Sequence, residues 1–199
     1  SLKVKQLLQN FIGNINLISL NDLKDFGGYY PFHSMKENGF LGSHVDHSRS
    51  KTGEIHMANS LYFASKEWDK NLGGETILFN STGYKPKIYI EPKPNRLVLF
   101  LHTSSTFHGV NFISKNAKFN RFSYYMDYYI DKKDLLDLQD NLKKKKVNAD
   151  YLLHSTIFIP FFPVGLKSFK FKSLFKLKNY YPYLHAYIKY LLNRYFLKY

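Results

Sequence analysis

The chain has 199 residues, of which 44% are hydrophobic and 18% aromatic, so it suits one folded domain with an appendage and is not a wholly disordered chain. It contains no cysteine, which excludes disulfides, zinc–thiolate sites, iron–sulfur clusters and cysteine nucleophiles, and leaves histidines and carboxylates to hold any metal. The net charge of +14 fits an anionic partner such as nucleic acid, a membrane surface or an acidic glycan, but it equally fits a general bias of composition.

In chain order, residues 1–26 predict a helix, centred on VKQLLQNFI, and then a polar segment. From about Phe40 to Ile130 the sequence is typical of strands, because short β-branched or aromatic runs alternate with turn signals such as NLGGE, STGYKP and PKPN. Such a series predicts a compact antiparallel sandwich or barrel. The predicted strands are HMANSLYFA, GETILFN, KIYIEP, RLVLFLH and RFSYYMDYYI.

After residue 131 the character of the sequence changes. DKKDLLDLQDNLKKKK predicts a helix. A proline-containing apolar stretch follows, and then the segment KSFKFKSLFKLK. A last helix is predicted near the end. Its apolar positions form one stripe: Leu184, Tyr187, Ile188, Leu191, Leu192 and Tyr195.

No secretory signal is recognisable in SLKVKQLLQNFIG, and prolines interrupt the longest apolar run. We therefore predict no transmembrane helix and expect a cytoplasmic location.

His44 and Asp46 stand two residues apart. On a strand, side chains at this spacing point to the same face and can reach one metal ion, although the pattern also occurs often by chance. A second histidine from a distant strand would complete a facial triad of two histidines and one carboxylate, the arrangement of non-haem iron(II) oxygenases. His108, in TFHGVNF, follows Asp46 by 62 residues and is our candidate.

Three other histidines compete for this role. His47 would face away from Asp46 on a continuing strand, toward solvent or substrate. His56 stands at the start of the predicted strand that contains Tyr62 and is interpreted as structural. His102 could line the pocket and is the alternative to His108.

The stretch from about Tyr29 to Ile130 resembles the prolyl-4-hydroxylase-like branch of the 2-oxoglutarate and iron(II) oxygenases. Four motifs in the family's order carry this resemblance and cover about half of the chain. They are the His-x-Asp of NGFLGSHVD, the segment SLYFASKEWDKNLGGETILF, the strand and histidine of RLVLFLHTSSTFHGV, and the Arg-x-Ser of RFS.

The resemblance implies a mainly β fold, a double-stranded β-helix (jelly roll) with flanking α-helices. It implies that iron(II) is held by His44, Asp46 and His108, and that 2-oxoglutarate and O₂ are cosubstrates, with ascorbate as a supporting reductant. The distal carboxylate of 2-oxoglutarate would be bound by three residues, namely Arg121, Ser123 and Tyr62. The guanidinium could make a bidentate ion pair with that carboxylate.

One departure concerns the arginine. Arg121 follows His108 by thirteen residues, more than is usual in the family, so a longer hairpin, NFISKNAKF, must absorb the difference. Lys115 and Lys118 are alternatives, but neither stands in an Arg-x-Ser pattern. Trp68 and the Gly73-Gly74 pair are expected to serve packing and a turn.

The implied activity is an oxygenase that couples decarboxylation of 2-oxoglutarate to hydroxylation of a protein side chain, a small metabolite or a glycan-linked group. Asp46 argues against a halogenase, in which a small residue replaces that carboxylate. The alternatives are a catalytically inactive, cupin-like jelly roll, and a basic protein that binds a membrane or nucleic acid through its C-terminal part.

We therefore divide the chain into an oxygenase domain over residues 1–132 and a basic, aromatic, helical extension over residues 133–199. The last 49 residues, 151–199, hold eight Lys or Arg and no acidic residue. The extension is expected to pack on the barrel or on a second protomer, or else to contact an anionic membrane surface. We favour packing on the barrel or on a second protomer, because the tyrosines of the last helix suit a buried stripe with hydrated hydroxyl ends.

Overall fold

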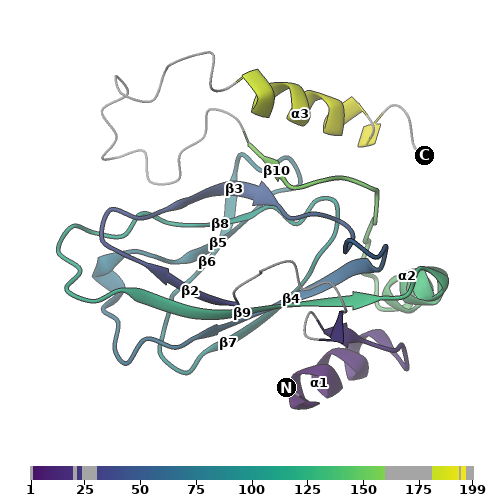
Figure 1. Ribbon diagram of the computed structural model, residues 1–199, viewed down its shortest axis with the longest axis horizontal. Coiled ribbons are helices and arrows are strands. Elements are labelled where there is room, and N and C mark those ends of the chain that lie inside the picture. The colour runs from purple at the N-terminus through teal and green to yellow at the C-terminus, as the bar shows by residue number, and fades with distance from the viewer. Residues whose placement is uncertain (1, 20–21, 24–30, 160–180, 193, 196–199) are drawn as a thin grey trace.

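The computed structural model describes residues 2–19, 22–23, 31–159, 181–192 and 194–195. Strands are the main regular elements; one α-helix precedes them, and two α-helices follow the long run of strands (Figure 1). The elements are α1 (Leu2–Ile12), β1 (Ile18–Ser19), β2 (Phe32–Met35), β3 (Leu41–Val45), β4 (Ile55–Phe63), a 3₁₀-helix (Lys70–Leu72), β5 (Thr76–Phe79), β6 (Pro86–Ile90), β7 (Leu97–Leu101), β8 (His108–Val110), β9 (Arg121–Ile130), a second 3₁₀-helix (Lys132–Asp134), α2 (Leu135–Lys144), β10 (Ile157–Phe158) and α3 (Tyr181–Leu192).

The strands form two antiparallel sheets that lie one above the other (Figure 1). In one sheet β9 pairs with β1, β2 and β4, and β4 pairs in turn with β7. In the other sheet the order is β10-β3-β8-β5-β6. Successive strands from β2 to β9 thus alternate between sheets, except that β5 and β6 are neighbours, which is the strand order of a jelly roll. The predicted mainly β fold is confirmed.

All five predicted strands are present, as β4, β5, β6, β7 and β9. The predicted strands do not include β1, β2, β3, β8 and β10, because none of these contains a run of β-branched residues. β8 consists of only three residues, His108-Gly109-Val110, and is a strand because it pairs with both β3 and β5. Tertiary pairing, not local propensity, decides its conformation.

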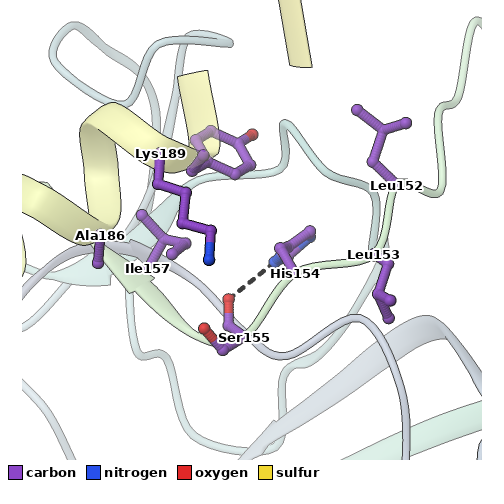
Figure 2. Close-up of a pocket in the computed structure, with 8 residues that line it drawn as sticks. Leu152, Leu153, His154, Ser155, Ile157, Ala186 and Lys189 are labelled. Atoms are coloured by element: carbon purple, nitrogen blue, oxygen red, sulfur yellow. Dashed lines mark hydrogen bonds between the residues drawn. The ribbon is translucent and has the colours of Figure 1, made fainter. Parts of the chain in front are cut away.

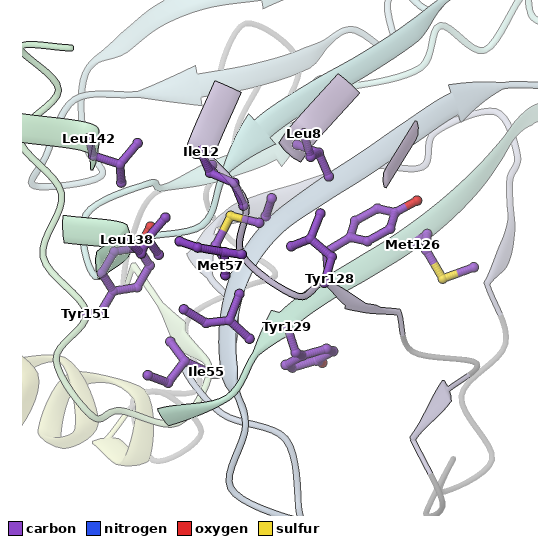
Figure 3. Close-up of a cluster of buried hydrophobic side chains, with 14 residues drawn as sticks. Leu8, Ile12, Ile55, Met57, Met126, Tyr128, Tyr129, Leu138, Leu142 and Tyr151 are labelled. Carbon is purple, nitrogen blue, oxygen red and sulfur yellow. The ribbon is translucent and has the colours of Figure 1, made fainter. Parts of the chain in front are cut away.

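The outer face of β9 packs against two helices, α1 near the N-terminus and α2, which follows β9 in the chain. Alternate residues of β9 point to this face, and Figure 3 shows Met126 and Tyr128 in one cluster with side chains from both helices. The cluster is made by Leu8, Ile12, Ile15, Leu17, Ile55, Met57, Ala58, Met126, Tyr128, Tyr129, Ile130, Leu138, Leu142 and Tyr151. These contacts leave the opposite face of β9 free to line the space between the sheets.

The C-terminal part of the chain also packs on the barrel. β10 extends the second sheet beside β3, and α3 lies over this sheet (Figure 1). Tyr187 and Tyr190 are buried against Phe107, and the Tyr187 hydroxyl donates to the Thr82 carbonyl over 2.9 Å. The packing that we favoured for the end of the chain is therefore observed for α3.

The predicted apolar stripe of α3 is only partly right. Tyr187 is buried and Leu191 partly buried, but Ile188, Leu192 and Tyr195 are about half exposed, at 47%, 46% and 51%. The buried face is rotated toward Tyr190, because the helix contacts the barrel along one flank only. The predicted lysine- and phenylalanine-rich segment lies outside the described residues.

A cavity of about 250 Å³ lies between α3 and residues 152–157, as Figure 2 shows. The described residues include no helix with both the length and the apolar character that a membrane crossing requires.

Candidate metal centre

Two histidines are brought together by strand pairing. β3 and β8 are antiparallel neighbours, and His44 stands directly opposite His108 in their register. The two imidazole rings are 4.3 Å apart between centroids, and both residues are buried, at 5% and 7% exposure. A cross-strand pair of this kind places two ring nitrogens within reach of one ion.

Asp46 completes the group. β3 ends at Val45, and the carboxylate that follows lies 3.5 Å from His44 Nε2 and 3.3 Å from His108 Nε2. The Tyr125 hydroxyl donates to Asp46 Oδ2 over 2.8 Å, and Asn59 Nδ2 donates to the same oxygen over 3.3 Å. These two donors fix the orientation of the carboxylate.

The donor set fits a metal ion. Nδ1 of His44 lies 2.8 Å from the Gly42 carbonyl and Nδ1 of His108 lies 3.2 Å from the Thr106 carbonyl. Because a carbonyl only accepts, each Nδ1 carries a ring proton, and Nε2 is the atom that faces the carboxylate and is available to a metal, as in histidines that bind metals. Two imidazoles and one carboxylate are the donor set of non-haem iron(II) sites.

The electrostatics of the three side chains also favour a cation. Burial by itself raises the pKa of Asp46, but the charges of His108 and His44 hold it well below its ordinary value. Burial lowers the pKa of His108, and the carboxylate of Asp46 more than offsets this, so that the net shift is upward. The carboxylate is thus held in the ionised form that a cation needs.

The triad faces a cavity of about 610 Å³ between the two sheets. Alternate residues of β9 line it in series, namely Arg121, Ser123, Tyr125 and Asp127. Strand β2 lines another part of the wall. The cavity therefore joins the triad to a row of polar side chains on one strand.

Arg121 is a buried cation on this wall, with 3% of its surface exposed. Its guanidinium donates to the Gly74 carbonyl (2.7 Å), Thr76 Oγ1 (3.0 Å) and Ser123 Oγ (3.3 Å). Among the described residues no carboxylate lies within ion-pair distance of it. Burial lowers the pKa of Arg121 to about 10, an effect that Glu75 partly opposes, so the group is still charged at neutral pH. A buried cation without a counter-ion favours an anionic ligand.

The comparisons with known proteins agree with this geometry. Residues 30–126 match the family model of the 2OG-Fe(II) oxygenase superfamily, and this range contains the triad and Arg121. The matched segment is a 2OG-Fe(II) oxygenase domain. The predicted recognition is confirmed, and the family implies iron(II), 2-oxoglutarate and O₂. No curated protein is similar enough to this chain to count as a match.

Three solved structures resemble the oxygenase domain distantly. A prolyl-4-hydroxylase from Pseudomonas putida is 17% identical, with a TM-score of 0.43, over 65% of this chain and 61% of that one. A prolyl hydroxylase from Trichoplax adhaerens, solved with a hypoxia inducible factor oxygen degradation domain peptide fragment, is 20% identical, with a TM-score of 0.45, over 66% and 54%. A prolyl 4-hydroxylase from Phytophthora capsici is 14% identical, with a TM-score of 0.39, over 73% and 63%. The chain thus spans between 54% and 63% of the lengths of these proteins.

Tyr62 does not reach the site of the oxygenase domain, contrary to the prediction. It is 38% exposed, its hydroxyl donates to Asn95 Oδ1 over 2.6 Å, and it does not line the cavity. The reason is the alternation of β4, in which Leu61 points into the cavity and its neighbour Tyr62 points outward. Thr76, which the sequence reading missed, stands beside the guanidinium instead.

Neither lysine alternative to Arg121 reaches the cavity of the oxygenase domain. Lys115 and Lys118 are exposed on the loop between β8 and β9. This loop accommodates the long spacing, because Ile113 forms an isolated bridge with Gly73 and a turn closes from Ser114 to Ala117. Gly73 has a positive φ of 74°, and a Cβ there would meet the Phe112 carbonyl oxygen, so the close approach requires glycine.

The competing histidines form a separate group beside the triad. The strand does not continue past Val45, so His47 lines the same cavity as Asp46 instead of facing away from it. His56 is fully buried next to Asp127, and its ring stacks on His102 at 3.9 Å. His102 is 1% exposed and does not line the cavity, which agrees with the choice of His108.

Proposed function

We propose that this chain is a non-haem iron(II) dioxygenase that couples the decarboxylation of 2-oxoglutarate to the hydroxylation of a second substrate. The observation that carries the proposal is the combination in one cavity of a triad of two histidines and one carboxylate with a buried arginine that forms no ion pair within the described part of the chain. A degenerate jelly roll would have no reason to keep both groups.

In this proposal His44, Asp46 and His108 hold the metal, which when bound supplies the activation of O₂. Tyr125 and Asn59 keep the carboxylate of Asp46 oriented through their hydrogen bonds. This support leaves the triad preorganised before the metal arrives.

Arg121 binds the distal carboxylate of 2-oxoglutarate, with Ser123 and Thr76 beside it. Both hydroxyls already hold the guanidinium in place, at 3.3 Å and 3.0 Å. Their second lone pairs and rotatable hydrogens allow them to bond the incoming carboxylate as well.

The second substrate is proposed to be a protein side chain, a small metabolite or a glycan-linked group. The decisive test is production of succinate from 2-oxoglutarate with iron(II), O₂ and ascorbate, first alone and then with members of each class. Wild-type protein should show turnover stimulated by one class, and His108→Ala should show none because it lacks a metal ligand. A His102→Ala control should retain metal binding. Loss of iron from His102→Ala but not from His108→Ala would overturn the assignment.

A cytoplasmic location, with peripheral contact to a membrane, is also part of the proposal, and the lack of cysteine fits a reducing compartment. An anionic membrane surface and a second protomer remain predicted partners of residues 133–199. The lysine-rich segment on which they depend lies outside the described residues.

A further inference from the structure

A second group of metal-ligand side chains stands beside the triad. His47, His56 and Asp127 offer ring nitrogens and a carboxylate oxygen that all lie within 4.8 Å of one another. They come from three places in the chain: the residue after Asp46, strand β4 and strand β9. His47 and Asp127 line the 610 Å³ cavity, which gives an ion a path to the group.

His56 has the geometry of the two histidines in the iron triad. Its Nδ1 lies 3.0 Å from the backbone carbonyl of His47, so Nδ1 carries a ring proton and Nε2 is the atom available to a ligand. That Nε2 lies 3.4 Å from Asp127 Oδ1, a separation between the 3.3 and 3.5 Å of the iron triad. Ligands about 2.0–2.1 Å from a tetrahedral zinc ion lie roughly 3.3–3.4 Å from each other.

Nε2 of His56 also lacks a hydrogen-bond partner among the described residues. The residue is 0% exposed, and its Nε2 makes no hydrogen bond in the described structure. A buried nitrogen that faces a buried carboxylate without a hydrogen bond needs a cation between the two atoms, either a proton or a metal ion.

The surroundings are built to hold the carboxylate. The Tyr129 hydroxyl donates to Asp127 Oδ2 over 3.1 Å and lies 3.0 Å from His47 Nε2. Asn59 Nδ2 stands between the two carboxylates, 3.3 Å from Asp46 Oδ2 and 3.5 Å from Asp127 Oδ1. One amide thus connects the second group to the triad.

We propose that His47, His56 and Asp127 form a second metal site, for a divalent ion of the zinc class, next to the iron centre. Two imidazoles and one carboxylate suit such an ion and leave a coordination position for water from the cavity. The bound ion cross-links β4, β9 and the residue after Asp46, and so stiffens the segment that carries an iron ligand. The site does not depend on the proposed reaction.

The test is metal stoichiometry of the full chain, stripped with a chelator, loaded with zinc and measured by mass spectrometry after dialysis. Wild-type protein should hold two zinc ions per chain, one in each site. His108→Ala and Asp127→Asn should each hold one, and the double variant should hold none. His108→Ala with His154→Gln is the matched control, since His154 is a neighbouring histidine outside the group, and it should still hold one.

A second measurement separates a specific site from adventitious binding. A hundredfold excess of zinc over its Kd should raise the Tm of His108→Ala by roughly 5–10 °C. The same zinc should leave the Tm of the double variant unchanged. The conservative Asp127→Asn change keeps the side-chain size, and circular dichroism checks that each variant is folded.

The outcomes distinguish this proposal from the function proposed above. If wild type holds one zinc ion and His108→Ala holds none, the triad is a metal site and the second group is a His–Asp ion pair that holds a proton, which overturns the proposal. Zinc retained by the double variant would equally overturn it, because the ion would lie elsewhere. If the triad alone failed, wild type and His108→Ala would both hold one ion that Asp127→Asn removes.

Discussion

At the scale of single residues, Arg121 shows how neighbours position a buried charge. Its three hydrogen-bond acceptors are a backbone carbonyl and two hydroxyl groups, none of which neutralises the guanidinium. The ring of Phe63 lies 5.0 Å from the guanidinium carbon and supplies a weak cation–π contact. A dicarboxylate would add the charge that the site lacks.

We predict that Arg121→Lys raises the KM for 2-oxoglutarate at least about tenfold. A lysine keeps the charge but cannot make the bidentate pair, and a loss of about 1.4 kcal/mol corresponds to one decade. Steady-state kinetics of succinate production would measure this. Lys118→Ala is the control and should leave KM unchanged, since Lys118 is exposed. A raised KM in Lys118→Ala and a normal KM in Arg121→Lys would show that Lys118, and not Arg121, binds 2-oxoglutarate.

At the scale of secondary-structure elements, α3 is anchored by two tyrosines. Tyr187 donates to the Thr82 carbonyl, and the ring of Tyr190 packs edge-on against Phe107 at 6.0 Å. Burial raises the pKa of Tyr190 to about 12, so its hydroxyl stays protonated under ordinary conditions.

Tyr187→Phe should lower the free energy of unfolding by about 0.5–1.5 kcal/mol, because it removes one hydrogen bond. Tyr187→Ala should lower it by about 3–5 kcal/mol, because it also leaves a cavity. Ile188→Ala, at an exposed position of the same helix, should have an effect of no more than about 0.5 kcal/mol. Urea unfolding would measure all three. Equal effects of Tyr187→Ala and Ile188→Ala would show that α3 does not pack on the barrel in solution.

The N-terminal helix has an anchor that depends on pH. Asp22 accepts from Lys5 Nζ at 2.6 Å and from Ser19 N and Oγ at 2.8 and 2.6 Å, and these bonds lower its pKa from 3.8 to about 2. Because the folded-state pKa is below the unfolded value, the stabilisation is complete above that value and is lost as the pH falls toward 2.

Asp22→Asn should therefore be less stable than wild type at pH 7, and the difference should vanish between about pH 4 and pH 2. Thermal melts across this range would measure the difference. A constant difference down to pH 2 would mean that the effect of Asn is steric and not electrostatic.

At the scale of the whole molecule, residues beyond 132 complete both hydrophobic cores. Leu138, Leu142 and Tyr151 belong to the cluster under the helices, while Ile157 and Tyr187 belong to the cluster under α3. β10 also covers the edge of β3 next to His44, which it meets at Phe158. The predicted boundary after residue 132 stays a proposal.

A chain that ends at residue 132 should aggregate and lose its metal affinity, because it exposes both cores and leaves β3 as an open edge. A chain that ends at residue 159 keeps α2 and β10, so it should stay folded with a lower Tm and bind metal. Size-exclusion chromatography and metal titration would compare the two. A monomeric, metal-binding chain of residues 1–132 would show that the barrel does not need the extension.

The sequence alone was sufficient for the jelly roll and for the triad. Strand-like runs and turn signals predicted five strands, and the spacing of His44 and Asp46 with a distant histidine predicted a metal centre that the structure assembles. These features are local or follow from motif order, so periodicity and resemblance could reach them. The same reasoning reached Arg121, although the longer loop before it had to be explained by the structure.

Only the tertiary structure decided which side chains share a face. In β4 the pairing register shifts between His56 and Ala58, so that His56 lies opposite Tyr129 and points into the interior together with Asn59. Simple alternation would have grouped His56 with Tyr62. The resemblance gave Tyr62 a role that its outward position rules out. A β-bulge reverses the facing of every residue on one side of it and leaves no reliable mark in the sequence, so the second histidine group could not be predicted.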